Sequence, residues 1–216
     1  ISGLEATYMD PQQRLFLEEA WRTLEHAGHA GADSEGRRCG VFVGCAHGDY
    51  QELFRSQPPG QAFWGNTCSL IPARIAYHLN LKGPAVAVDT ACSSSLVAVH
   101  LACQSLWQGD SDLALAGGVF IQSSSRFYRY GNQAKMLSPS GRCAAFGAGA
   151  DGIVPGEAVA AVLLRPLSQA LADGDTIHGV IVASGINQDG ATNGITAPSA
   201  LSQEQLIREV YQRYAI

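Results

Sequence analysis

One cysteine lies where the sequence changes from a strand pattern to a helix pattern. The apolar run Ala85 to Val88 predicts a short buried strand, and a helical pattern begins directly after Cys92. A thiol in such a bend lies near the free backbone N–H groups of the helix N-terminus, whose partial positive charge favours the thiolate. Because the thiolate is the nucleophilic form, the sequence predicts that Cys92 acts in covalent catalysis. The alternative, a buried structural cysteine, is disfavoured at this junction.

The other five cysteines have no comparable setting. They form no Cys-x-x-Cys pair, and no His/Cys spacing is typical of a zinc site, so we expect no bound metal. We therefore predict that they are reduced packing residues, namely Cys39, Cys45, Cys68, Cys103 and Cys143.

Composition excludes several classes of function. The chain has 216 residues, a net charge of −5 and no basic stripe, so nucleic acid and anionic membrane are not expected partners. No apolar run approaches the ~18 residues that span a bilayer. The first residues resemble no signal peptide and include no initiating Met. We therefore expect a cytoplasmic protein that is a piece of a longer polypeptide.

Alternating helix and strand patterns indicate an α/β protein that positions the bend around Cys92. The first helix is expected to begin at an Asp10 N-cap with a capping-box-like Gln13, and to stop at Gly28. The helix after Cys92 should end at Gly109, with Leu96 among its buried residues. A strand, this helix and a further strand would form a parallel crossover. The expected strands are 40–44, 85–88, 112–119, 157–164 and 177–183, and the other expected helices are 69–80, 123–136, 167–172 and 201–214.

Four other features could carry chemistry. The stretch Gly147 to Gly152 matches Gly-x-Gly-x-x-Gly, but it lacks the preceding strand and following helix of a dinucleotide site. Asp89 is expected to cap or brace the bend. His100 is expected to be a packed core histidine, while His47 follows a strand and could line a cleft. No histidine of the chain is predicted as the base for Cys92.

The segment Asp89-Thr90-Ala91-Cys92-Ser93-Ser94-Ser95-Leu96 resembles the active-site segment of β-ketoacyl synthases. The likeness is to the ketosynthase domains of modular type I polyketide synthases, which belong to the thiolase-like superfamily. Supporting stretches extend over nearly all of the chain, at 5–6, 9–14, 72–75, 83–84, 137–143, 150–152 and 185–199. Residues 154–157 and 170–175 further resemble synthases whose acyltransferases act from separate proteins.

This resemblance implies a thiolase-like fold of α/β/α/β/α layers, paired as a homodimer. Residues 1–185 would form most of the first half of a ketosynthase domain, and 186–216 the beginning of the second. Cys92 would accept an acyl chain from the phosphopantetheine thioester of an acyl carrier protein, with its own backbone N–H as an oxyanion donor. A malonyl-type extender on a second carrier would then lose CO₂ and condense with the acyl group. The chain itself would bind no cofactor.

A loop late in the chain is implied to shape the entrance for the acyl chain or the pantetheine. The residues concerned are Asn187, Asp189, Gly190, Asn193 and Thr196.

The sequence also departs from the family pattern. The family's two catalytic histidines lie in His-Gly-Thr-Gly-Thr and Asn-x-Gly-His motifs, which we expect beyond Ile216. Gly147 stands where an Asp usually follows the Phe, and Ala158 where Gly is typical. Two alternatives therefore stay open: a non-elongating ketosynthase that only transfers acyl groups, and an inactive fragment that serves as a dimerisation or docking scaffold. Such a fragment would leave apolar surface unburied.

Overall fold

The computed structural model describes residues 1–31, 35–55 and 57–216, which form one mixed four-stranded sheet in the order β2-β1-β3-β4. β1 is parallel to both β2 and β3, whereas β4 runs antiparallel to β3. The predicted α/β class and the parallel pairing around the Cys92 bend are therefore confirmed. The strands are β1 (Cys39–Gly44), β2 (Ala85–Val88), β3 (Leu113–Phe120) and β4 (Ala158–Leu164).

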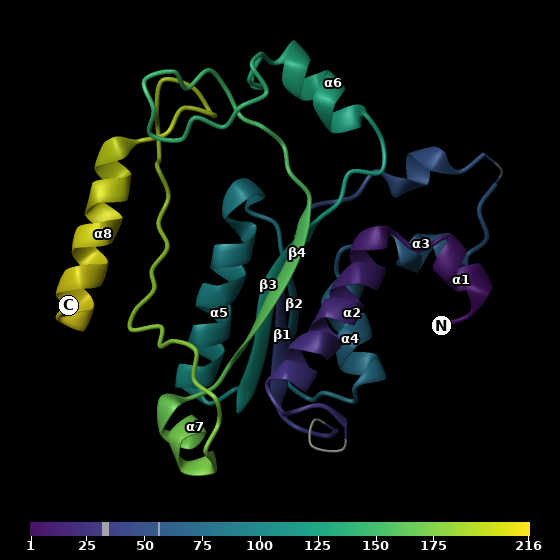
Figure 1. Ribbon diagram of the computed structural model, residues 1–216, viewed down its shortest axis with the longest axis vertical. Coiled ribbons are helices and arrows are strands. Elements are labelled where there is room, and N and C mark those ends of the chain that lie inside the picture. Colours follow the sequence, from purple (N-terminus) through teal and green to yellow (C-terminus); the bar gives the residue numbers. More distant parts are fainter. Residues whose placement is uncertain (32–34, 56) are drawn as a thin grey trace.

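Helices cover both faces of this sheet, with α2 and α4 on one side and α5 on the other (Figure 1). The described helices are α1 (Gly3–Thr7), α2 (Pro11–His26), α3 (Gln61–Gly65), α4 (Leu70–His78), α5 (Ser94–Gln108), α6 (Arg126–Gln133), α7 (Leu167–Asp173) and α8 (Ala200–Tyr214), with short 3₁₀ turns η2 (Tyr50–Leu53) and η3 (Ala91–Ser93).

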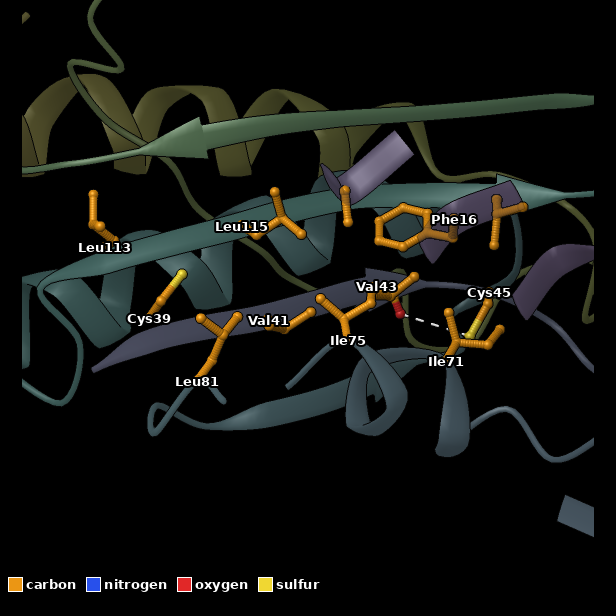
Figure 2. Packing of buried hydrophobic residues seen from close by; sticks show 12 residues of the cluster. Phe16, Cys39, Val41, Val43, Cys45, Ile71, Ile75, Leu81, Leu113 and Leu115 are labelled. Carbon is orange, nitrogen blue, oxygen red and sulfur yellow. Dashed lines mark hydrogen bonds between the residues drawn. The ribbon is translucent and has the colours of Figure 1, made fainter. Parts of the chain in front are cut away.

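The alternation of side chains along the strands divides the core into two clusters. Val41 and Val43 of β1 pack with Phe16 of α2 and Ile75 of α4 on one face, as Figure 2 shows. Phe42, between those two valines, points to the other face and packs under α5. There the contact is made largely by alanines, which let the helix lie close to the strands. These alanines are Ala98, Ala102, Ala114 and Ala116.

The start of α2 confirms one expected cap and corrects another. The Asp10 carboxylate accepts a hydrogen bond from the Gln12 backbone N–H at 2.8 Å, as an N-cap should. Gln13 does not complete a capping box, because its side chain is used in a tertiary contact. Its amide nitrogen donates to the Trp64 carbonyl at 2.9 Å, and its amide oxygen accepts from Arg74 Nε at 3.1 Å.

Helix α5 ends at Gly109, as expected, with a left-handed φ of 78°. The predicted burial of Leu96 is wrong, because its side chain is 75% exposed. The face of α5 that meets the sheet carries small residues, so the bulky apolar side chains of Leu96 and Trp107 lie on other faces. The exposure of these two side chains agrees with the expectation that part of a ketosynthase domain leaves apolar surface unburied.

In the last third of the chain, the structure confirms the predicted strand β4 and the predicted helices α7 and α8. Helix α6 is shorter than the predicted helix 123–136. The predicted strand 177–183 is wrong, since no ladder forms there. Val180 and Val182 are 55% and 66% exposed, and within the described residues no neighbouring strand supplies hydrogen-bond partners. None of the helices in the described ranges is long and apolar enough to cross a membrane.

Candidate active site

Cys92 is exposed in the η3 turn, between the end of β2 and the start of α5. Asp89 braces this bend as predicted, because its Oδ1 accepts from the Ala91 backbone N–H at 3.1 Å. The Ser94 hydroxyl adds a second brace, accepting from Thr90 N at 2.8 Å and donating to the Ala91 carbonyl at 2.6 Å. Ala91 itself has a φ of 57°, in the left-handed region that favours glycine. The backbone thus turns sharply and under strain immediately before Cys92.

Two glycines let the first turn of α5 lie directly on the sheet. A Cβ on Gly44 would lie 2.4 Å from the Ser95 backbone nitrogen, and one on Gly118 would lie 2.8 Å from Ser95 Cβ. Gly44 and Gly118 are register partners toward the carboxyl ends of parallel strands β1 and β3. This close approach sets Cys92 at the strand ends, the usual place for ligands in open α/β sheets.

The backbone N–H of Cys92 takes part in none of the hydrogen bonds of the described residues. An amide hydrogen without an acceptor is free to donate to a ligand, and the role of this N–H as an oxyanion donor stays a prediction. The preference of Cys92 for the thiolate stays a prediction.

The Cys92 bend opens into a cavity of about 980 Å³ with mainly apolar walls. Its floor is the sheet, and one wall is α6, from which Phe127 and Tyr130 face the space. His47 lines the same cavity, which confirms the expectation that it could line a cleft. A cavity of this size and polarity suits an apolar chain attached to the cysteine.

Asp49, which the sequence analysis did not single out, fixes the chain that enters α6. Its carboxylate accepts from the backbone N–H groups of Ser123 and Ser124 at 2.8 and 3.0 Å, and from the Ser124 hydroxyl at 2.6 Å. Burial tends to raise the pKa of Asp49, but these hydrogen bonds outweigh burial and hold the pKa below its ordinary value. An Arg126–Glu52 ion pair at 3.0 Å supports the same junction. The three serines that follow β3, at 123–125, were a weak sequence signal that a carboxylate accepts hydrogen bonds there.

Gln122 is a second residue that the sequence did not reveal. It lines the cavity, yet both its amide oxygen and its amide nitrogen are buried without a hydrogen-bond partner in the described chain. Unpaired buried amides are costly, so a polar ligand group that reached this amide would be favoured there.

The predicted packing role is confirmed for Cys39, Cys45 and Cys103, which are buried, and Cys68 is partly buried against the same core as Cys45. It is wrong for Cys143, which is exposed because the long loop before β4 leaves it in solvent.

His100 is a packed core histidine, as predicted. Its ring is buried on α5, its Nδ1 lies 2.8 Å from Ser184 Oγ, and burial lowers its pKa. The Gly147 to Gly152 stretch lies in turns, with neither a strand directly before it nor a helix directly after it. Among the residues that the structure describes, no cluster of three His, Cys, Asp or Glu side chains has the geometry of a metal site.

The structure places the other predicted site residues away from Cys92. Asn187 donates to the Ser202 carbonyl at 2.7 Å, and Asp189 accepts from Ser199 N at 3.2 Å, so both hold the start of α8. Gly190, Asn193 and Thr196 follow in an exposed loop, and none of the five residues lines the cavity at Cys92. Their role at a substrate entrance stays a prediction.

Comparison with known proteins gives a consistent result. The family model described as "Beta-ketoacyl synthase, N-terminal domain" matches residues 1–170. The chain is 51% identical to the polyketide synthase PksM of Bacillus subtilis over its whole length, but it covers 5% of that protein. It is 48% identical to the polyketide synthase GfsA of Streptomyces halstedii, a match that covers 100% of the chain and 3% of that protein.

Solved structures agree with these sequence matches. The ketosynthase from module 6 of the bacillaene synthase of Bacillus subtilis superposes with a TM-score of 0.94 at 47% identity. The Streptomyces albus oxazolomycin ketosynthase domain OzmH KS7 superposes with a TM-score of 0.92 at 39% identity. Both matches cover the whole chain and 37% and 38% of the solved chains. The bend that carries Cys92 therefore lies within a thiolase-like ketosynthase fold, of which these residues form the N-terminal portion.

Proposed function

Because the chain belongs to the β-ketoacyl synthase family, within the ketosynthases of modular polyketide synthases, we propose that Cys92 is its acyl acceptor. The observation that carries the proposal is an exposed thiol on a strained, braced turn, at the mouth of an apolar cavity. Strain held by surrounding hydrogen bonds is common where a nucleophile must be presented.

The proposed first step is a transfer between thioesters. The Cys92 thiolate attacks the carbonyl carbon of an acyl chain carried on the phosphopantetheine of an acyl carrier protein. The Cys92 N–H, unused within the described residues, stabilises the resulting oxyanion. Collapse expels the pantetheine thiolate and leaves the acyl group on Cys92, where the apolar cavity receives its chain. The phosphopantetheine belongs to the carrier and is part of the substrate.

The proposed second step lengthens the chain. A malonyl-type extender on a second carrier protein loses CO₂, and the carbanion that forms attacks the Cys92 thioester. The new carbon–carbon bond releases the Cys92 thiolate, and the chain gains two backbone carbons.

We propose that this occurs in a cytoplasmic homodimer, with residues 1–185 and 186–216 in the two halves of the domain. The long stretch without helix or strand between α7 and α8 supports a change of layer there.

Acylation of the full-length protein tests the first step. Incubation with an acyl thioester should add one acyl mass to the tryptic peptide that contains Cys92, as measured by mass spectrometry. Cys92→Ala should take up none, whereas Cys143→Ala, which removes the other exposed thiol, should label like the wild type. Label that persists in Cys92→Ala would remove Cys92 from the mechanism. Adding a malonyl-type carrier thioester then separates an elongating enzyme, which releases CO₂, from one that only transfers.

A further inference from the structure

The loop that follows α6 folds back on itself, so that residues 136–138 meet residue 153. Ser138 N donates to the Ile153 carbonyl at 2.9 Å, and Ile153 N donates to the Met136 carbonyl at 2.9 Å. These two bonds form an isolated parallel bridge between Leu137 and Ile153. Met136 and Ile153 both line the cavity at Cys92. The bridge therefore joins two parts of the cavity wall that come from opposite ends of this loop.

Side-chain hydrogen bonds reinforce the bridge. The Ser138 hydroxyl donates to Asp151 Oδ1 at 2.5 Å, and Ser140 Oγ lies 3.0 Å from Ser138 Oγ. The bond from Ser138, with help from Ser140, lowers the pKa of Asp151, which is therefore an ionised acceptor at neutral pH. None of these three residues is among the described residues that line the cavity. We call the bridge and these three side chains the 136–153 clasp.

The clasp depends on a close approach of the backbone at Gly152. A Cβ on Gly152 would lie 2.5 Å from the Ser138 backbone nitrogen and 2.6 Å from the Leu137 carbonyl carbon. Gly152 also has a φ of 150°, which residues with a Cβ rarely adopt. Because the obstacle is backbone, no side-chain rotation would make room for a larger residue. Glycine at this position is therefore a requirement of the clasp.

The first residues of the clasp are held by the end of α6. Lys135 has a left-handed φ of 55°. Its N–H donates to the Asn132 carbonyl at 3.0 Å, and Met136 N donates to the Gly131 carbonyl at 2.9 Å, a pattern that closes many helices. Helix α6 supplies other side chains of the cavity wall, and Figure 1 shows it beyond the end of the sheet where α5 begins. The clasp thus holds Ile153 and the end of α6 together as one wall.

We propose that the clasp sets the acyl-chain length that the enzyme prefers, with Ser138 and Asp151 as positioning residues; this rests on the proposed acylation of Cys92. A cavity of about 980 Å³ is much larger than an acetyl group, so only a long chain extends over most of its wall. Met136 and Ile153 are each 44% exposed, and a long chain gains affinity by covering such apolar surface. This gain requires that the clasp hold both side chains in place.

Gly152→Ala in the full-length protein tests this proposal. Gly149→Ala is the matched control, because its methyl group lies in the same loop with nothing within 4 Å. Single-turnover acylation of Cys92 is followed by mass spectrometry, with acetyl and decanoyl thioesters of N-acetylcysteamine. We expect Gly152→Ala to lower the ratio of the decanoyl to the acetyl rate constant about 10-fold, which is typical of lost contacts in an apolar pocket. Acetyl transfer should stay near the wild-type rate, and Gly149→Ala should keep the wild-type ratio.

Ser138→Ala is a milder second variant, because it removes the hydroxyl donor and leaves the backbone bridge. It should lower the same ratio by a smaller factor. The proposal is overturned if Gly152→Ala folds with the wild-type ratio, or if its acetyl and decanoyl rate constants fall equally, since a general loss of structure would have that effect.

A binding measurement separates this proposal from the proposed function. The fluorescent fatty acid cis-parinaric acid is titrated into Cys92→Ala and into the double variants that also carry Gly152→Ala or Gly149→Ala. We expect only the Gly152→Ala double variant to bind more weakly, by about 10-fold. If Cys92 takes up no acyl group but this difference is found, the proposed function fails and the clasp stands. Equal dissociation constants would overturn the clasp even if Cys92 is acylated.

Discussion

Substituting Gly44 by alanine should impair acylation of Cys92 without touching any reacting group. The added Cβ would lie 2.4 Å from the Ser95 backbone nitrogen, where ordinary contact begins at 3.4 Å. The obstacle is backbone, so a side-chain rotation cannot relieve it. The first turn of α5 must therefore move by about 1 Å, which is typical of the adjustments forced by overpacking. Because η3 leads directly into α5, Cys92 moves with that turn.

Two magnitudes follow from this displacement. Overpacking of a formed core costs about 1–3 kcal/mol of the free energy of unfolding. A shift of about 1 Å in a positioned reacting group costs on the order of 100-fold in rate. Gly44→Ala should thus lower the rate constant for acylation of Cys92 far more than a variant that loses the same free energy of unfolding without displacing Cys92.

Gly40→Ala is the matched control in the same strand. Its Cβ would lie 2.6 Å from the ring of Phe42 and 2.7 Å from the Ser111 hydroxyl, both of them side-chain atoms rather than the backbone of α5. We expect Gly40→Ala to lower the melting temperature but to leave the acylation rate per folded molecule near that of the wild type. The assay is single-turnover mass spectrometry with an acyl thioester, beside thermal unfolding followed by circular dichroism. Equal acylation rates for the two variants would refute the reasoning that Gly44 positions Cys92.

Four further substitutions test other parts of the structure. Asp49→Asn should lower the melting temperature at pH 7, and the difference from wild type should shrink as pH falls below about 3.9, since a lowered pKa stabilises the fold only while the carboxylate is ionised. Gln122→Leu should raise the free energy of unfolding in urea by about 1–2 kcal/mol, because it removes an unpaired buried amide; an unchanged value would mean that the amide is satisfied in solution. Glu5→Gln should cost ~2 kcal/mol, because it leaves the buried Arg74 guanidinium without its charge partner at 2.8 Å. Glu18→Gln, which breaks an exposed pair, should cost less than about 0.5 kcal/mol in the same urea titration.

The sequence was most informative where local chemistry and tertiary structure agree. The Asp10 cap, the Gly109 stop and the strand that ends before Cys92 all depend on residues close together in the chain, and the structure confirms them. Gln13 shows the limit of this reasoning, because a local capping pattern gave way to partners more than fifty residues away. Leu96 shows another, since helical spacing cannot tell which of two apolar faces meets the sheet.

The residues of the candidate site also divide into those that a local sequence pattern predicts and those that it does not. The position of Cys92 was predicted, because a cysteine in a strand-to-helix bend is a local signal. Asp49 and Gln122 were not, because their importance depends on which segment lies opposite them in the fold. No spacing rule connects such residues before the chain has folded.

The long connection between β3 and β4, residues 121–157, separates the wall of the cavity from the bend that carries Cys92. Cys92 and the glycines beneath it belong to the sheet and to α5, whereas Phe127, Tyr130 and much of the cavity roof come from residues 121–157. Substitutions or insertions in that connection can change the volume and shape of the cavity while the bend that carries Cys92 stays as it is. An architecture of this kind lets one reaction be retained through gene duplication while the range of accepted substrates diverges from copy to copy.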